Sequence, residues 1–65
     1  MILFLVRRLD NMMYLGATVE WTKDFTQVQP FDTYKEAMEA GDKTGAYYEI
    51  VIGHRVMNKI AKETS

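Results

Sequence analysis

Residues 2–8 read ILFLVRR, and this short apolar run decides the fold. Its first five residues are all apolar, which is typical of a strand that is buried on both faces. Five apolar residues are too few for a helix of ordinary length, and the arginine pair ends the run. We therefore predict a strand over 2–8 that lies in the middle of a small sheet.

A second strand is predicted over 13–22, where apolar and polar residues alternate. The residues on one face are Met13, Leu15, Ala17, Val19 and Trp21. Alternation with a period of two indicates a strand that turns one face to the core. Residues 9–12 contain Asp-Asn, a pair that tolerates left-handed backbone geometry and predicts a hairpin turn before this strand.

A helix is expected over 34–43, after a loop that ends at Pro30. Thr33 and Glu36 match the S/T-x-x-E capping box, in which each residue satisfies a backbone N–H of the other at the start of a helix. The residues expected to face the sheet are Tyr34, Ala37, Met38 and Gly41.

Residues 46–53 alternate again and predict a third strand, which we place antiparallel beside the strand over 2–8. Residues 54–62 carry apolar side chains at helix-like spacing, so a short C-terminal helix is possible there, with a strand extension as the alternative. The whole chain, 1–65, is then one α+β domain. It is expected to have a three-stranded antiparallel or mixed sheet with one helix on one face.

Composition limits the class of protein. The 65 residues contain no cysteine, which removes thiolate metal sites and cysteine nucleophiles. The formal net charge is −1, whereas a general nucleic-acid coat protein is basic. The longest apolar run, 1–6, is much shorter than a membrane span, and no signal-peptide pattern follows it. We expect a cytoplasmic protein with no membrane partner.

Catalytic chemistry finds little support in the residue pattern. His54 is the only histidine, and no nucleophile or set of metal ligands stands at a suitable spacing from it. No glycine-rich phosphate-binding motif is present. We expect no enzymatic activity, no cofactor and no metal.

The second face of the predicted sheet is the feature most relevant to function. A single helix covers one face, so Tyr14, Tyr47 and Val51 are expected on the other, beside apolar residues of the central strand. A small monomer rarely exposes a continuous apolar patch. The C-terminal segment, a second copy of the chain or a partner protein is therefore expected to cover it. Tyrosines with aliphatic neighbours are a typical interface composition.

Two groups of charged residues complete the candidate binding site. The basic group, expected beside that open face, is Arg7, Arg8, His54 and Arg55. With Tyr14 and Tyr47 as stacking platforms it would allow nucleic-acid binding, although without an overall basic excess such binding is weak and salt-sensitive. The acidic group is Glu36, Glu39 and Asp42, a stripe along the helix. It either meets a basic groove on a partner or is only a solvated face.

One sequence pattern resembles a known group of proteins. It consists of residues 31–37 (FDTYKEA) and 48–51 (YEIV), with Trp21 near the end of the second predicted strand and Gly45 after the helix. The pattern is similar to that of small accessory proteins of bacteriophages and other mobile elements. The resemblance implies a non-enzymatic protein that binds and inhibits or modulates one host protein, such as an RNA polymerase, a nuclease or a CRISPR effector. It carries no site residues with it.

Two alternatives to this function remain open. One is a nucleic-acid-binding accessory protein that uses the basic group and the aromatic face. The other is a homodimeric structural or assembly protein.

Overall fold

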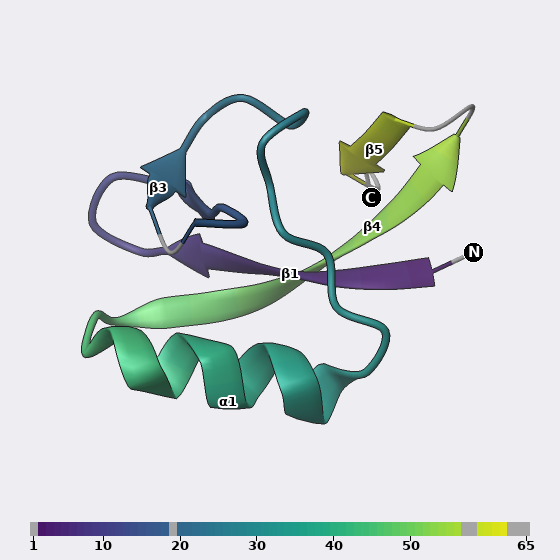
Figure 1. The fold of residues 1–65 in the computed structure, drawn as a ribbon. Coiled ribbons are helices and arrows are strands. Elements are labelled where there is room, and N and C mark those ends of the chain that lie inside the picture. The colour runs from purple at the N-terminus through teal and green to yellow at the C-terminus, as the bar shows by residue number, and fades with distance from the viewer. Residues whose placement is uncertain (1, 19, 57–58, 63–65) are drawn as a thin grey trace.

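The computed structural model describes residues 2–18, 20–56 and 59–62. The elements in chain order are β1 (Ile2–Arg8), β2 (Tyr14–Leu15), β3 (Trp21–Thr22), α1 (Tyr34–Thr44), β4 (Tyr48–Val56) and β5 (Lys59–Lys62). The strands form one antiparallel sheet in the order β3-β2-β1-β4-β5, and α1 lies along one side of it (Figure 1). The predicted α+β class with one helix is confirmed.

β1 lies at the centre of the sheet, as its two-sided apolar sequence predicts. It pairs with β4 along its whole length, from Ile2 opposite His54 to Arg8 opposite Tyr48. On its other edge it pairs with β2, where Arg7 lies opposite Tyr14. The predicted bounds of this strand and its antiparallel pairing with the next long strand are confirmed, but that strand spans Tyr48–Val56 and not the predicted 46–53.

The prediction of one continuous strand over 13–22 is wrong, because the chain folds back on itself within that range. β2 and β3 pair with each other, and the Gly16 amide donates to the carbonyl of Glu20 at 2.7 Å. A Cβ at Gly16 would lie 2.9 Å from the Glu20 carbonyl oxygen and 3.0 Å from that of Gln27. This close approach of three backbone segments requires glycine. Val19 falls outside the described residues.

The predicted helix over 54–62 is also wrong. β4 continues to Val56, and β5 pairs back onto it with Val56 opposite Lys59 and His54 opposite Ala61. A nine-residue helix is marginal unless it has a surface to pack on, whereas a hairpin extends an existing sheet through backbone hydrogen bonds. The strand extension considered as the alternative is the observed structure. Met57 lies outside the described residues.

α1 begins at the predicted cap and ends one residue later than predicted. The Thr33 hydroxyl accepts from the Glu36 amide at 3.1 Å and donates to the Glu36 carboxylate at 3.2 Å. Gly45 ends the helix in the left-handed conformation, with φ 74°, and its amide donates to the carbonyl of Asp42. Both ends of the helix thus follow from local sequence.

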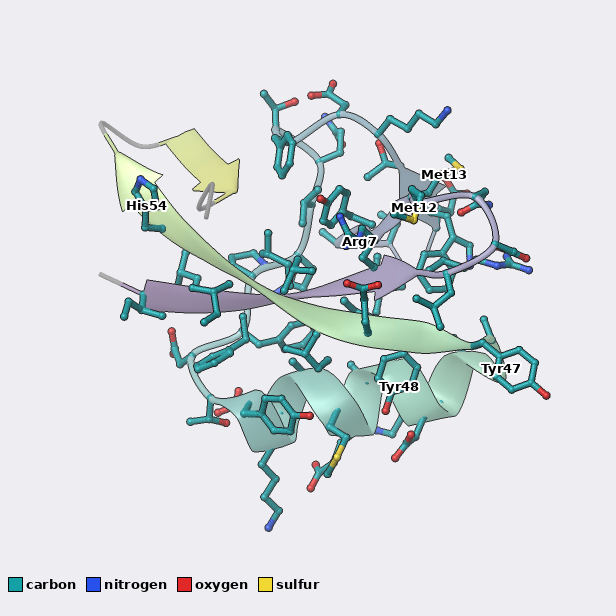
Figure 2. The ribbon with its side chains drawn as sticks, turned by 180° about the vertical axis from the view of Figure 1, so that it is seen from behind. Arg7, Met12, Met13, Tyr47, Tyr48 and His54 are labelled. Atoms are coloured by element: carbon teal, nitrogen blue, oxygen red, sulfur yellow. The ribbon has the colours of Figure 1, made fainter. Side chains whose placement is uncertain are left out.

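The helix packs closely on the sheet through its small residues. Ala37 and Gly41 are buried, whereas Tyr34 and Met38 are 56% and 38% exposed. The prediction that all four residues face the sheet is therefore wrong for Tyr34 and Met38. The ring of Tyr48 lies under Gly41, where a Cβ would approach ring carbons to 2.7 Å (Figure 2). The small residues let the helix approach the sheet, and the larger ones are left at its margin.

The other face of the sheet is covered by the segment between β3 and α1. Leu5, Tyr14 and Val28 form a buried cluster, and Phe25 and Val51 pack against it. In Figure 1 this segment passes above the sheet and then crosses to the helix side. The prediction that Tyr14 and Val51 lie on an open face is therefore wrong. The covering side chains come from residues 23–30, which have no periodicity that would mark them as core.

Candidate functional site

Among the described residues, a groove between α1 and two backbone segments, 15–17 and 29–31, offers a candidate site. It has a volume of about 330 Å³, within the lower range of ligand pockets in proteins. Its lining residues are Leu15, Gly16, Ala17, Gln29, Phe31, Glu36, Glu39, Ala40 and Lys43. We call this the α1 groove.

One wall of the α1 groove is a single face of the helix. Glu39 and Ala40 lie three and four residues after Glu36, and Lys43 lies four and three residues after them, so the four side chains project from the same side of α1. The cap at Thr33 fixes where this wall begins, because it sets the first turn of the helix. The helical wall is therefore held in place by local interactions.

The opposite wall is held by backbone hydrogen bonds between segments distant in sequence. The Gln29 amide donates to the carbonyl of Leu15 at 2.9 Å, and the Ala17 amide donates to that of Gln27 at 3.2 Å. Farther along, Phe31 exchanges two backbone hydrogen bonds with Phe4 in the central strand. The groove is thus anchored to the sheet.

The lining combines apolar and charged side chains in a definite order. Leu15 is buried, and Phe31 and Ala40 are half-buried, so apolar surface lies between the two walls. Glu36 and Glu39 bring carboxylates to the N-terminal part of the helical wall, and Lys43 stands in its last turn. The groove is therefore acidic toward one end and basic at the other.

Toward the described residues, the Glu39 carboxylate uses little of its hydrogen-bonding capacity. Its nearest cation, Lys35 Nζ, is 4.0 Å away, and both side chains are largely exposed. Exposed helix pairs of this kind contribute only a few tenths of a kcal/mol. The Glu36 carboxylate accepts one bond, from the Thr33 hydroxyl, and keeps further lone pairs.

The third member of the predicted acidic stripe has a different, structural role. Asp42 accepts a hydrogen bond at 2.5 Å from the hydroxyl of Tyr48, which also lies 2.9 Å from the carbonyl of Met38. The hydrogen bond to Asp42, together with desolvation and the charge of Asp42, raises the pKa of Tyr48 to about 12. Asp42 holds the helix to β4 and does not line the α1 groove.

Arg7 and Arg8 are both engaged within the domain. The Arg7 guanidinium lies 2.5 Å from Glu49 on the neighbouring strand, and this hydrogen bond is the main cause that raises the pKa of Arg7. Arg8 Nε lies 2.8 Å from an Asp10 carboxylate oxygen, and its guanidinium stacks 5.4 Å from the centre of the Trp21 ring. These contacts hold both arginines against the sheet.

The rest of the predicted basic and aromatic set is not gathered into one site. Tyr14 is only 7% exposed, with its ring 5.0 Å from that of Phe25, while Tyr47 is 87% exposed. Tyr47 and the half-buried His54 lie at opposite ends of the molecule (Figure 2). The side chain of Arg55 lies outside the described part of the structure. Of the predicted stacking pair, only Tyr47 is on the surface.

Sequence reasoning finds two groove residues, Glu36 and Glu39, and misses the apolar part of the groove. The spacing of Ala40 and Lys43 from Glu36 could have marked one helical face. Ala17 and Phe31 could not have been found in this way, because Ala17 reaches the groove through the fold-back at Gly16 and Phe31 through its pairing with Phe4.

The described residues offer neither a metal site nor a membrane-spanning helix. Within those ranges, no three His, Asp or Glu side chains are grouped so that they could hold a metal ion. The described residues form no helix of the length and apolarity needed to cross a membrane. The sequence matches no protein-family model, and no curated protein or solved structure matches it.

Proposed function

We propose that this chain is a non-enzymatic protein that binds a host-cell protein and inhibits or modulates it, with the α1 groove as its binding surface. The groove supports this proposal because it offers apolar surface beside exposed carboxylates. An apolar centre with a polar rim is the usual composition of a protein-recognition site. The resemblance to bacteriophage accessory proteins points to the same class of function.

The charges of the groove favour a protein over a nucleic acid as the ligand. Glu36 and Glu39 would repel a phosphate backbone, which binds to lysine and arginine clusters. Arg7 and Arg8 are engaged by Glu49 and Asp10. Nucleic-acid binding therefore has less support here than protein binding. The lack of cysteine agrees with a reducing compartment such as the cytoplasm.

Affinity capture from bacterial lysate tests this function when it is run with a blocked groove. Ala17 lines the groove and is exposed, so Ala17→Trp fills the groove with little disturbance of the core. Thr18→Trp is the matched control, since Thr18 is exposed but does not line the groove. The tagged wild type and Thr18→Trp should capture the same protein, with or without nuclease, and Ala17→Trp should not. A partner lost after nuclease treatment would argue for nucleic-acid binding instead.

A homodimer is a second candidate, supported by a separate strip of exposed apolar side chains. The strip consists of Ile2, Tyr34, Met38 and Ile52. Tyr34 contacts the ring of Phe4 edge-on at 6.2 Å, and Phe4 lies opposite Ile52, so these residues are near one another. Sedimentation equilibrium over a range of concentrations tests this candidate. A mass of one chain at every concentration would rule out the dimer.

A further inference from the structure

We infer that the α1 groove takes a short segment of its partner in which an arginine or lysine stands next to a large apolar residue. This inference rests on the proposed function and specifies the chemistry of the ligand. The apolar residue would enter between the two walls, and the basic residue would reach Glu36 and Glu39 on the helical wall.

The small size of the groove limits how much of a partner can enter it. Its volume of about 330 Å³ lies near the lower end of the range for ligand pockets. It can therefore accept one or two side chains with their backbone, and the apolar contribution of Leu15, Phe31 and Ala40 fits an aliphatic or aromatic one.

Charge complementarity fixes the neighbour of that apolar residue. The lining contains two carboxylates and one ammonium group, and Gln29 is the only other polar side chain among the lining residues. Glu36 and Glu39 are three residues apart on the helix, and within the described part of the chain the Glu39 carboxylate has one ion-pair contact, at 4.0 Å with Lys35. A cation placed there gains two attractive contacts, whereas an acidic residue is repelled.

Lys43 gives the bound segment a direction. It stands four residues beyond Glu39, which is about 6 Å along the helix axis. An extended chain covers that distance in about two residues. A basic residue is therefore favoured at the end near Glu36 and disfavoured one apolar residue farther on. The segment that fits best has its basic residue on only one side of the apolar one.

Short synthetic peptides with the ¹⁵N-labelled full chain test this inference. The probe is acetyl-Gly-Arg-Leu-Gly-amide, with the Glu-Leu and Arg-Ser versions as charge and apolar controls. In two-dimensional NMR titrations we expect the Arg-Leu peptide to shift amides at Leu15, Ala17 and Phe31. The Glu-Leu and Arg-Ser peptides should bind at least fivefold more weakly.

A matched pair of variants checks the role of the carboxylate. Glu39→Gln should lower the affinity for the Arg-Leu peptide about two- to fivefold, which is the range expected for the loss of one exposed ion pair. Glu20→Gln should leave its affinity unchanged, because Glu20 is exposed and does not line the groove. Ala17→Trp should abolish the shifts in the groove.

Three results would overturn the inference. These are equal binding of the Arg-Leu and Glu-Leu peptides, equal binding of the Arg-Leu and Arg-Ser peptides, or no shift at the groove with any of them. The proposed function would still stand if the partner captured by the wild type were lost with Ala17→Trp. Loss of that difference in capture would refute the proposed function whatever the peptides do.

Discussion

Replacing Gly41 by alanine tests the close packing of α1 on β4, on which the helical wall of the groove depends. A Cβ at this position would lie 2.7 Å from ring carbons of Tyr48, so the ring must move. The ring is not free to do so, because its hydroxyl is bonded to Asp42 at 2.5 Å. Overpacking of this kind costs about 1–3 kcal/mol. Alanine also stabilises a helix interior by about 1 kcal/mol relative to glycine.

The two effects predict that Gly41→Ala changes the free energy of unfolding in opposite directions in the wild type and in a Tyr48→Val background. In the wild type, Gly41→Ala should lower the free energy of unfolding by about 1 kcal/mol, the overpacking cost less the helix gain. In a Tyr48→Val background the clash is absent, and the same change should raise it by about 1 kcal/mol. The coupling between the two sites is then about 2 kcal/mol, well above the deviation expected for independent sites.

Urea unfolding provides the measurement, with the fluorescence of Trp21 as the probe. Trp21 is the only tryptophan and packs in the helix-side core. Four proteins are needed: the wild type, each single variant and the double variant. Gly41→Ala effects that are equal in both backgrounds would refute the packing argument.

Three further predictions concern the cap, the fold-back and the helix-sheet contact. Thr33→Ala should lower the free energy of unfolding by about 1 kcal/mol in urea, while Thr33→Ser should be nearly neutral; equal losses would show that the hydroxyl does not cap α1. Gly16→Ala should cost about 1–3 kcal/mol, because its Cβ meets two backbone oxygens at 2.9 and 3.0 Å; unchanged thermal unfolding would contradict that crowding. The bond to Asp42 raises the pKa of Tyr48 from its usual 10.0 to about 12, so its contribution to stability is complete below pH 10 and is lost as the pH rises toward 12. Urea midpoints measured across this range should therefore fall more steeply for the wild type than for Tyr48→Phe, and parallel curves would exclude the effect.

The parts of the fold that depend on local chemistry were predictable from the sequence. The apolar run at the start of 2–8 indicates a central strand, because a strand that is apolar on both faces must be covered on both. Leu5 and Val6 are indeed buried in the clusters on opposite faces of the sheet. Thr33 and Glu36 mark the start of α1, since a capping box acts within one helical turn. Neither inference needs knowledge of a distant contact.

The errors have two physical causes, which are hairpins that form within a stretch predicted as one element and contacts between segments farther apart in sequence. The alternation of apolar and polar residues over 13–22 continues through the turn after Gly16. A period of two therefore cannot distinguish one long strand from the two short paired strands that the structure has. Val28 lies in a stretch without periodicity, yet its side chain is buried against Leu5 and Tyr14.

The candidate site was only half predictable for the same reason. Glu36 and Glu39 share a helix, and helical spacing places them on one wall. Phe31 reaches the groove because it bonds to Phe4, and Arg7 is engaged by Glu49, 42 positions along the chain. No local pattern contains these pairs.

The most direct test of the proposed function is the affinity of the captured protein for the wild type and the two tryptophan variants. Isothermal titration with purified components gives all three dissociation constants. If the α1 groove is the binding surface, Ala17→Trp weakens binding at least tenfold and Thr18→Trp leaves it within about twofold, since only Ala17 lines the groove. Equal dissociation constants for all three proteins would show that the partner binds elsewhere and would contradict the account.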